Sequence, residues 1–458
     1  MMPGETNLKE IARTLFEQAL AECSIERAFD RKVRVVEGEA GTRLLVDGSD
    51  AITLDQLRRV RVVSVGKAAA AMLNALLARM RLAATCDLQG VLIAAERTVN
   101  LPATIQYFCG GHPLPNEASF AGARAALAML HGLRDASAQN TSADDTLCIF
   151  LLSGGASAMM ELPLDAAISL DDTVAFHRAL VHSGASIVEM NCVRKHFSAV
   201  KGGRLALAAG RAQMLSLLVS DVPPAHLDAL GSGPTVGDTT TVAECREILE
   251  RYGLMEKFPA PVRRFFALAE LQETPKPGEL NARICKLVDS DEMAEAAQRH
   301  AERLGFYAVI DNACDDWSYD AAAEYLLDRL RELRREHARV CLISAGEVAV
   351  RVDVSRANAR GGRNQHFALY MAIQLRAEDG PIAVLSAGSD GVDGNSDAAG
   401  AIVDEHMIDC SATRESALRV LTEFDSSTWL SGVGATVVTG PTGHNLRDLR
   451  ILLADDAP

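Results

Sequence analysis

The clearest site chemistry in this sequence lies within residues 386–404, where Asp390, Asp393 and Asp397 alternate with Gly388, Gly391 and Gly394. Asp390, Asp393 and Asp397 offer carboxylate oxygens, which are hard ligands of the kind that Mg²⁺ prefers. The glycines let the backbone turn tightly and approach a ligand, and the apolar run at residues 382–385 predicts a buried strand that leads into this loop. A surface turn rich in Asp and Gly is the structural alternative.

A second stretch, residues 360–365, places two arginines and two side-chain amides around a glycine pair at the predicted start of a helix. Guanidinium groups bind phosphate oxygens through paired hydrogen bonds. Carboxylates for a cation and guanidinium groups for an anion together predict a site for magnesium and phosphate.

Other polar turns directly follow predicted strands, where α/β sheets bind their ligands. Lys67 comes after the strand glycine Gly66, a position from which its ammonium could reach a phosphate or carboxylate. An exposed surface lysine is the alternative, although a cation at a helix start opposes the helix dipole. The turn at residues 153–157 could cradle an anion with free backbone N–H groups or be a simple tight turn. It is not a Walker loop, because no Gly-Lys-Ser or Gly-Lys-Thr closes it.

Length and composition predict a two-domain protein of 458 residues, with 48% apolar residues and few aromatics. The net charge of −15 and the lack of a basic patch argue against nucleic acid as a partner. No apolar run approaches the ~20 residues that a membrane span needs, and the first 20 residues contain no apolar signal core. We therefore expect a cytoplasmic protein that acts without membrane or nucleic acid.

The cysteine and histidine patterns predict no disulfide framework and no structural zinc site. The ten cysteines include no CxxC pair, and the eleven histidines include no HExxH motif. His177 and His182 are five residues apart, which is a poor spacing for two metal ligands on one helix. Scattered, buried and reduced thiols are the expectation.

Strands alternate with helices along the chain, as in parallel sheets with crossover helices, and predict the α/β class. A charged, proline-containing segment at residues 273–279 punctuates this order, and the domain break is expected between residue 236 and this segment. We place the domains at residues 1–250 and 251–458. Predicted strands are 61–66, 90–94, 105–108, 147–152, 214–219, 340–344, 348–352 and 382–385, with 436–438 and 451–453 closing the second sheet; predicted helices include 8–23, 67–80, 117–130, 170–183, 188–209 and 321–336.

Eleven short motifs occur in order along the chain, and their combination is much more specific than any one of them. Together, over residues 66–453, they resemble the glycerate 2-kinases of the MOFRL family. The motifs are Val65-Gly66-Lys67-Ala68-Ala69, Gly111-His112-Pro113-Leu114-Pro115, Leu152-Ser153-Gly154-Gly155, Asn191-Cys192-Val193-Arg194-Lys195-His196, Lys201-Gly202-Gly203-Arg204-Leu205, Ser220-Asp221-Val222-Pro223, Ser232-Gly233-Pro234-Thr235, Gly361-Gly362-Arg363-Asn364-Gln365, Gly388-Ser389-Asp390-Gly391, Asp397-Ala398-Ala399-Gly400 and Gly440-Pro441-Thr442-Gly443.

The resemblance implies transfer of the ATP γ-phosphoryl group to the C2 hydroxyl of D-glycerate, giving 2-phosphoglycerate and ADP. It implies a Rossmann-like N-terminal domain with a parallel sheet, a smaller α/β C-terminal domain of the MOFRL type, and an active site in the cleft between them. It also makes Lys67 and Arg363 the catalytic candidates. ATP and Mg²⁺ are the expected cofactors, D-glycerate is the expected partner, and the chain is expected to be a monomer or homodimer.

Finer roles are hypotheses, grouped by the chemistry that each residue type offers. Substrate or phosphate binding is assigned to Ser153, Gly154, Gly155, Ser157, Asn191, Lys195 and Asp221, the last as the group that orients the substrate hydroxyl. Nucleotide binding is assigned to Gly233, Thr235, Gly361, Gly362, Asn364 and Asp390, and metal binding to Asp390 and Asp393. Alternative roles are a helix cap for Asp397, local ion pairs for Arg194 and Arg204, and either a magnesium contact or a strand anchor for Glu347.

The sequence departs from the family pattern at several loop positions. His366 stands where a Glu usually follows the Gly-Gly-Arg-Asn-Gln run, which leaves the support of the preceding arginine open. Ala345 replaces a usual glycine, and His444 replaces a usual threonine. Pro224 and Ala225 stand where Gly and an acidic residue are common, which weakens a metal role for that loop. Substrate preference could differ while the chemistry is kept.

Two rival functions predict different features. A hydroxypyruvate reductase would need a nicotinamide site, normally a GxGxxG turn, and the turn that begins at Gly66 lacks the second and third glycines. A non-catalytic sensor of a sugar acid or nucleotide would be expected to lack one of the phosphate-handling cations, yet Lys67 and Arg363 are both present.

Overall fold

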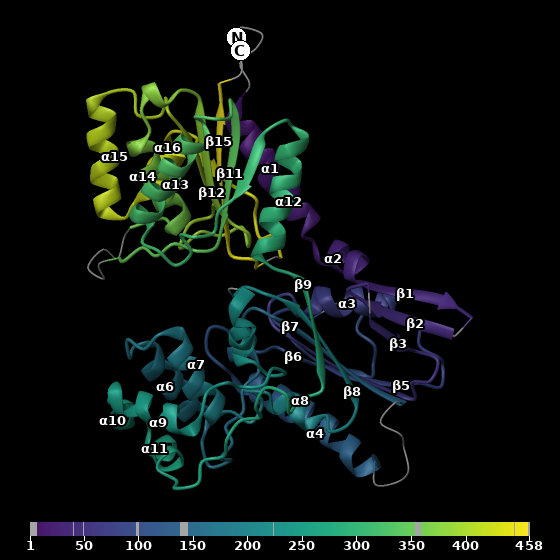
Figure 1. The fold of residues 1–458 in the computed structure, drawn as a ribbon. Coiled ribbons are helices and arrows are strands. Elements are labelled where there is room, and N and C mark those ends of the chain that lie inside the picture. The colour runs from purple at the N-terminus through teal and green to yellow at the C-terminus, as the bar shows by residue number, and fades with distance from the viewer. Residues whose placement is uncertain are drawn as a thin grey trace. The chain divides into compact units, whose positions relative to one another are not determined.

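The computed structural model describes residues 7–456 except 40, 49, 98–99, 138–144, 223, 353–358 and 444 (Figure 1). The chain divides into two compact units. The N-terminal unit is Ile25–Leu287, and the C-terminal unit combines Met1–Ser24 with Val288–Pro458. Each unit has its own central six-stranded sheet, so the predicted two-domain α/β architecture is confirmed.

The N-terminal unit is built on a sheet whose first five strands in spatial order are parallel. The order of the strands reverses between β4 and β7, because the chain first builds outward from β4 on one side and then from β7 on the other. In register, Val63 of β4 lies between Val91 and Phe150. The spatial order is β6 (Ile105–Phe108), β5 (Asp87–Ile93), β4 (Arg59–Val65), β7 (Thr146–Ser153), β8 (Gln213–Val219) and β9 (Ala282–Val288).

Helices cover both faces of this sheet, which explains the nearly continuous apolar sequence of its central strands. All eight residues of β7 are buried. Figure 1 shows α3 (Ala69–Arg79) on one face and α4 (Glu117–Ser137) with α8 (Arg204–Ala208) on the other. The core between sheet and helices includes Val65, Phe150, Leu130 and Leu205.

The N-terminal unit has two further layers, of which the sequence predicted only the helices at residues 170–183 and 188–209. A short antiparallel sheet follows α2 (Ile25–Lys32) and consists of β1 (Val33–Gly38), β2 (Gly41–Val46) and β3 (Asp50–Thr53). A helical lobe surrounds stacked Phe176 and Phe197, whose ring centroids are 4.1 Å apart. Its helices are α6 (Leu170–Val181), α7 (Ile187–Phe197), α9 (Val242–Arg251), α10 (Leu254–Lys257) and α11 (Ala260–Phe266), and the 3₁₀ segment η2 (Pro224–Ser232) packs on α7.

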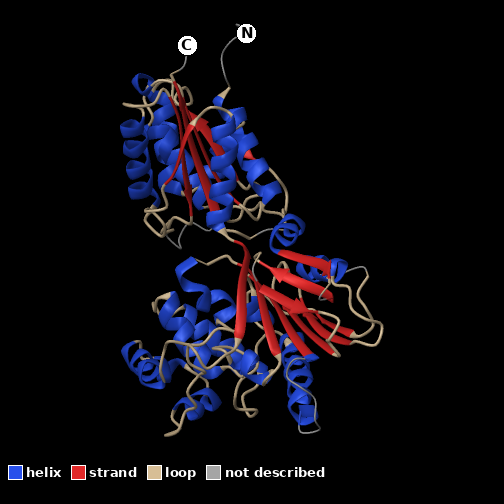
Figure 2. Ribbon diagram, turned by 45° about the vertical axis from the view of Figure 1, so that its right-hand side comes forward, coloured by secondary structure: helices blue, strands red, loops and turns tan. Residues whose placement is uncertain are grey.

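The C-terminal unit has a mixed sheet in which only the pair β10–β11 is parallel. Its strands in spatial order are β10 (Tyr307–Ile310), β11 (Arg339–Ala345), β15 (Asp448–Asp455), β12 (Ile382–Gly388), β13 (Gly400–Asp404) and β14 (Thr436–Val437). Helices α1 (Leu8–Glu22) and α12 (Ser290–Arg303) cover one face (Figures 1 and 2). The other face carries α13 (Tyr319–Leu333), α14 (Arg363–Gln374), α15 (Ser411–Glu423) and α16 (Ser426–Gly432).

Three element predictions need correction. The last strand does not close the second sheet: β15 inserts antiparallel between β11 and β12, at its centre. The strand predicted at residues 348–352 is only an isolated bridge between Ser318 and Ala349. The helix predicted at residues 188–209 is broken into α7 and α8. Helix α7 ends at its C-cap Ser198, whose backbone is extended, and Gly202 and Gly203 before α8 have φ angles of 55° and 80°, a left-handed conformation that an α-helix cannot contain.

The predicted domain boundary at residue 250 lies inside α9, and the structure divides the chain elsewhere. Helix α1 belongs to the C-terminal unit, where Glu22 accepts hydrogen bonds from Arg299 (2.5 Å) and His300 (3.0 Å) of α12. Strand β9 adds a sixth strand to the N-terminal sheet before the chain enters the C-terminal unit. The chain therefore passes between the units twice, after Ser24 and after Leu287.

Two further predictions concern the state of the cysteines and the presence of a membrane-spanning helix. The ten cysteines are free, and seven of them are buried; Cys109 and Cys410 are exposed. No helix in the described part of the chain combines the length and the apolar character that a bilayer span requires.

Candidate active site

The carboxyl ends of three adjacent parallel strands carry predicted site residues of the N-terminal unit. Ser153 ends β7, Lys67 follows β4 by two residues, and Asp221 follows β8 by two residues. Because β7 pairs with both β4 and β8, these positions share one edge of the sheet. Lys67 and Ser153 lie at the point where the strand order reverses, which is the usual ligand position in open α/β sheets.

The turn that carries Lys67 is fixed by the neighbouring β7 turn. The Lys67 backbone N–H donates to the Gly154 carbonyl (2.9 Å), and the Ala68 N–H donates to Ser153 Oγ (3.0 Å). Gly66 has a φ of 122°, and a Cβ there would stand 2.3 Å from Ser153 Oγ. The Lys67 side chain itself is exposed, and its ammonium has no hydrogen-bond or ion-pair partner among the described residues. The backbone of this turn is held by two hydrogen bonds, and the Lys67 ammonium faces solvent.

His112 borders the same turn, although it was not among the assigned site residues. Gly155, with a φ of 84°, lies between His112 and Lys67: a Cβ there would stand 3.1 Å from His112 Cδ2 and 3.3 Å from Lys67 Cγ. Desolvation and the Lys67 charge both lower the pKa of His112. The imidazole beside Lys67 is therefore neutral at pH 7. The signal for it was the Gly-His-Pro-Leu-Pro motif.

Hydroxyl and amide groups form a chain from the β7 turn to α7. Ser157 Oγ lies 2.6 Å from Ser232 Oγ, and Ser232 donates to Asn191 Oδ1 (3.0 Å). Arg194 also reaches Asn191 Oδ1, at 3.4 Å. Gly233, with a φ of 64°, fixes the neighbouring backbone, because a Cβ there would lie 2.8 Å from the Asp228 carbonyl. The structure thus brings together the predicted residues Ser157, Asn191 and Gly233.

Lys195 is buried, and its charge is already neutralised. It donates to Asp228 (2.7 Å) and Asp238 (3.1 Å), two acids that sequence reasoning missed because they lie 33 and 43 residues further along the chain. The Thr235 hydroxyl accepts a hydrogen bond from Ser216 of β8 (2.9 Å), which leaves its own O–H able to donate. Asn191, Lys195 and Thr235 nonetheless line one pocket of about 600 Å³.

Three buried ionisable side chains, those of Glu161, His177 and Lys201, form a hydrogen-bonded cluster. Glu161 accepts hydrogen bonds from Lys201 and from His177 Nε2 (3.0 Å). Burial alone would raise the pKa of Glu161, but Lys201 and His177 outweigh it and lower the pKa to about 2. Arg194 is mostly buried. Burial lowers its pKa, and the nearby negative charge of Glu161 opposes that shift, which is consistent with the predicted alternative role of Arg194 as a local ion partner.

The C-terminal unit has its own pocket of about 720 Å³, which contains Arg363. Arg363 opens α14 and is held by two carboxylates: Asp448 accepts from Nε (2.5 Å) and Nη2 (3.2 Å), and Glu347 Oε1 lies 2.7 Å from Nη2. Burial acts to lower the pKa of Arg363, yet Asp448 and Glu347 raise it above its usual value. The guanidinium is therefore preorganised and permanently charged.

Asp393 caps the helix that Arg363 begins. Its carboxylate accepts the backbone N–H groups of Asn364 (3.0 Å) and Gln365 (2.8 Å), which would otherwise be unpaired at a helix start. Burial, together with the charge of Asp448, raises the pKa of Asp393 to about 6 despite these bonds. Gly362 allows this approach, because a Cβ there would stand 2.2 Å from Asp393 Oδ1. This geometry favours capping over the predicted metal ligation.

Asp390 remains the better placed of the two predicted metal ligands. Its Oδ1 accepts only the nearby Val392 N–H (3.1 Å) among the hydrogen bonds recorded for the described residues. Gly388 lies between Asp390 and Asp448. A Cβ at Gly388 would stand 3.2 Å from Asp390 Oδ1 and 3.4 Å from Asp448 Oδ1. Asp397 is fully exposed beside Arg360 (3.7 Å) and is followed by β13 rather than a helix, so it caps no helix.

His366 is a packing residue and not a substitute for the usual acid. Its ring stacks on Phe424 (5.4 Å between centroids) and meets the edge of Tyr319 (4.4 Å). Burial lowers its pKa to about 4, against a small opposing effect of Asp320. Asp448 and Glu347 supply the support for Arg363 that the sequence had left open. His444 lies outside the described residues, and the side chains of Pro224 and Ala225 are likewise not described.

The assigned residues thus form two groups, one in each unit. Five of them line the Arg363 pocket: Gly361, Gly362, Asn364, Asp390 and Asp393. Gly233 and Thr235 were assigned to the same nucleotide but lie in the N-terminal unit. Asp448, the main partner of Arg363, was missed because its only local signal is a position before an apolar run.

Comparisons with known proteins cover almost the whole chain. The family model described as a domain of unknown function (DUF4147) matches residues 11–267, and the MOFRL family model matches residues 340–448. A D-glycerate 2-kinase of Thermotoga maritima is 36% identical over 86% of this chain and 90% of its own length. An Agrobacterium vitis protein provisionally named hydroxypyruvate reductase is 32% identical over 98% and 95%. A crystal structure of a Thermotoga maritima glycerate kinase superposes with a TM-score of 0.79 at 31% identity, over 98% of this chain and 99% of that chain.

Proposed function

This chain belongs to the glycerate kinase family that joins a DUF4147 domain to a MOFRL domain, and we propose that it transfers the γ-phosphoryl group of ATP to the C2 hydroxyl of D-glycerate. The products are 2-phosphoglycerate and ADP. The observation that carries the proposal is the position of Lys67, an uncompensated cation beside the β7 turn at the reversal of strand order, in a chain with this family relationship.

Phosphoryl transfer proceeds through a loose transition state, so that positioning and neutralisation of charge are the main tasks of the enzyme. The Pγ–O bond to ADP breaks as the bond from the glycerate C2 oxygen to phosphorus forms. In the proposal, Lys67 binds the transferring group or the glycerate carboxylate, and the Ser153–Gly155 turn and Ser157 hydroxyl contribute hydrogen bonds. Arg363 binds the phosphates from the other unit. Its clamp by Asp448 and Glu347 fixes the direction of its remaining N–H groups.

The hydroxyl proton of glycerate needs an acceptor at the same sheet edge. Asp221 was assigned to orient this hydroxyl, and its position two residues after β8 is consistent with that role. His112 is the second candidate, since its lowered pKa keeps the imidazole neutral and able to accept a proton at pH 7.

The charge balance of the Arg363 pocket supports a requirement for Mg²⁺. The pocket is lined by five acidic side chains and two arginines, so its net charge is negative and a polyphosphate would be repelled without an added cation. The acids are Asp316, Glu347, Asp390, Asp393 and Asp448, and the arginines are Arg363 and Arg447. Asp390 would hold the ion, with Asp448 beside it, whereas Asp393 is occupied as a helix cap. Bound Mg²⁺ would neutralise phosphate charge.

The finer fold assignment belongs to the same proposal. The order β6-β5-β4-β7-β8-β9 corresponds to the 3-2-1-4-5-6 order of doubly wound nucleotide-binding sheets, which supports a Rossmann-like description of the N-terminal unit. Lys67 and Arg363 lie in different units, and the location of the active site in an interdomain cleft stays a prediction, as do the cytoplasmic location and the oligomeric state.

The reductase name of one relative is the reason to test hydride transfer directly. A dinucleotide turn needs glycines where the helix packs against the strand, and here Ala68 and Ala69 occupy the start of α3. A reductase is therefore disfavoured, although it acts on a related three-carbon acid.

The deciding assay measures ADP release from Mg-ATP with D-glycerate and reads the position of the product phosphate by phosphorus NMR. We expect 2-phosphoglycerate and no oxidation of NADH or NADPH with hydroxypyruvate. A 3-phosphate would keep the kinase and contradict the C2 assignment. Absence of turnover, with calorimetric binding of glycerate or ATP, would favour the sensor instead.

A further inference from the structure

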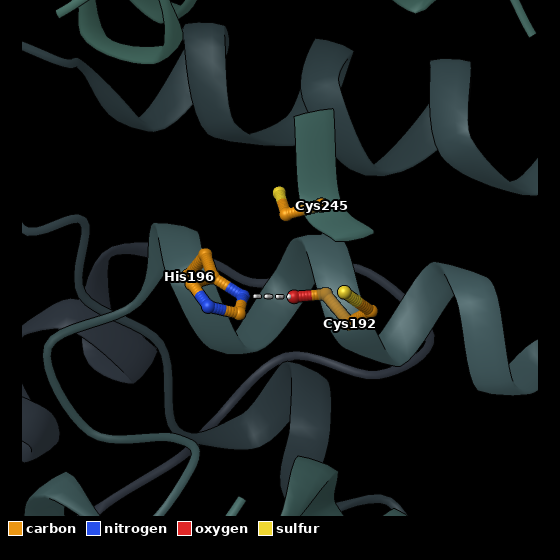
Figure 3. A group of neighbouring side chains, drawn as sticks. All are labelled: Cys192, His196 and Cys245. Carbon is orange, nitrogen blue, oxygen red and sulfur yellow. Dashed lines mark hydrogen bonds between the residues drawn. The ribbon is translucent and has the colours of Figure 1, made fainter. Parts of the chain in front are cut away.

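Three metal-binding side chains meet in the helical lobe of the N-terminal unit. Cys192 and His196 lie one helical turn apart on α7, and Cys245 lies on α9 (Figure 3). The two sulfur atoms and one ring nitrogen of His196 all lie within 4.8 Å of one another. All three residues are buried. Within the described residues, this is the one group of three or more such side chains that comes close enough to hold a metal ion.

One nitrogen of the His196 ring bonds the backbone, and the other makes no hydrogen bond within the described chain. Nδ1 forms a hydrogen bond with the Cys192 carbonyl oxygen (2.9 Å), which Figure 3 shows as a dashed line. The other nitrogen, Nε2, is buried and has no hydrogen-bond partner within the described chain; the Glu273 carboxylate is 3.6 Å away. Metal-ligating histidines usually bind a backbone carbonyl or carboxylate through one nitrogen and the metal through the other. A buried nitrogen without a hydrogen bond is costly. In Figure 3, Nε2 lies on the side of the ring away from the Cys192 sulfur, so metal binding through Nε2 requires the ring to turn.

We propose that Cys192, His196 and Cys245 bind a thiophilic divalent metal ion of the zinc class, which links α7 to α9. Tetrahedral zinc with Zn–S bonds of about 2.3 Å places two sulfur ligands roughly 3.8 Å apart, so the cluster needs to contract by no more than about 1 Å. Both thiols lose their protons to solvent on binding. Three protein ligands leave a fourth position for water or for a neighbouring oxygen.

Comparison with other buried cysteines distinguishes this cluster from ordinary core thiols. Cys148 is buried in β7, and burial raises its pKa to about 12, as expected for an inert thiol. Cys192 and Cys245 are buried too, but each has a second thiol and a ring nitrogen of His196 within 4.8 Å.

The position of the site suggests a structural role that does not depend on the proposed kinase activity. Cys192 and His196 directly follow Asn191 and Lys195, which line the 600 Å³ pocket from the same helix. A metal ion between α7 and α9 would hold this helix in place behind the pocket. Its loss would lower stability first and affect ligand binding only through the position of α7.

The test uses the full chain, purified without chelator from cells grown with added zinc, and then its apo form titrated with Co²⁺. Elemental analysis should find about one zinc per chain, and Co²⁺ should produce a thiolate charge-transfer band and tetrahedral d–d bands. Cys192→Ser with Cys245→Ser should reduce bound zinc at least about tenfold and abolish the Co²⁺ band. Zinc should also raise the unfolding temperature of the wild type and leave that of the double variant unchanged.

Cys148→Ala and Cys341→Ala are the matched controls, because both remove a buried thiol outside the cluster. Both should keep the zinc and the Co²⁺ spectrum. Should the double variant fail to fold, His196→Gln provides a second reading, with the charge-transfer band weakened and the d–d bands changed. Wild-type protein that takes up neither zinc nor Co²⁺, or in which thiol titration finds a Cys192–Cys245 disulfide and no metal, would overturn the proposal.

Discussion

Each of the two units carries one of the two cations proposed to bind the ligand, and the surroundings of the two cations differ. Lys67 is exposed and has no acidic partner among the described residues, and only its backbone is fixed, by Ser153 and Gly154. Arg363 is clamped by Asp448 and Glu347, and the helix that it opens is capped by Asp393. A cation without an acidic partner can attract an anionic ligand with its full charge. A cation paired with carboxylates adds little net charge, and its main effect is to orient its hydrogen-bond donors. The two cations should therefore fail differently when altered.

Removal of Lys67 should have the largest effect. Lys67→Ala should lower kcat by about 10³-fold, because one positioned cation on a transferring phosphoryl group contributes on that order. Stability should change little, since the side chain is exposed and makes no hydrogen bond or ion pair in the described structure. Steady-state kinetics with Mg-ATP and D-glycerate, together with thermal unfolding, measure both.

Lys67→Arg is the control that keeps the charge. It should recover part of kcat, because the backbone anchors remain, but not all, since guanidinium and ammonium geometries differ. A Lys67→Ala enzyme with near wild-type kcat would remove Lys67 from the chemistry and leave Arg363 as the sole catalytic candidate.

Loosening the clamp on Arg363 should have the next largest effect. Asp448→Asn keeps the size of the side chain but removes the charge that accepts from Nε and Nη2. We expect a loss of about 10²-fold in kcat, with a smaller change in KM, because a misdirected guanidinium costs positioning. The Mg²⁺ concentration for half-maximal rate should also rise, since Asp448 lies beside Asp390.

Asp316→Asn is the matched control, because Asp316 borders the same pocket but its side chain is 75% exposed and pairs only weakly with Arg447 (3.4 Å). Its kinetics should stay within about twofold of the wild type. Equal losses in Asp448→Asn and Asp316→Asn would indicate that general pocket charge matters, and that the clamp does not.

The same contrast explains what the sequence revealed about this molecule. Lys67, Ser153 and Asp221 were predictable, because each follows an apolar strand and parallel strands bring such ends to one edge. The clamp on Arg363 was not, since Asp448 lies 85 residues further on and meets it only because β15 inserts into the middle of a mixed sheet. Strand order within an antiparallel set leaves little trace in local periodicity.

Other misses have the same physical origin in long-range packing. Helix α1 was predicted in place, yet nothing local indicated that its apolar face packs on α12 in the C-terminal unit. The cluster of Cys192, His196 and Cys245 has no CxxC signal, because its second thiol comes from another helix, 53 residues further along the chain. Asp393 was assigned to metal by its type and spacing, and no local pattern indicated that its carboxylate caps α14.

The smallest predicted effect concerns stability and acid. His366 is held in the C-terminal unit with a pKa of about 4, whereas an unfolded histidine has a model value of 6.5. Its contribution to stability is therefore complete above pH 6.5 and is lost progressively as the pH falls toward 4. Between pH 7.5 and pH 5 the loss amounts to about 2 kcal/mol. Lys67 and its turn, in the other unit, have no such buried histidine beside them, because His112 is exposed.

His366→Phe isolates this contribution, because phenylalanine can keep the ring contacts with Tyr319 and Phe424 but does not titrate. Calorimetric unfolding at pH 7.5 and pH 5 should show a smaller acid destabilisation in the variant, by about 2 kcal/mol. His177, which is also buried with a lowered pKa, is present in both proteins, so its effect cancels in the difference. Equal acid sensitivity in wild type and variant would mean that His366 is protonated without cost, through a partner such as Asp320, and that the C-terminal pocket tolerates acid as well as the exposed Lys67 turn does.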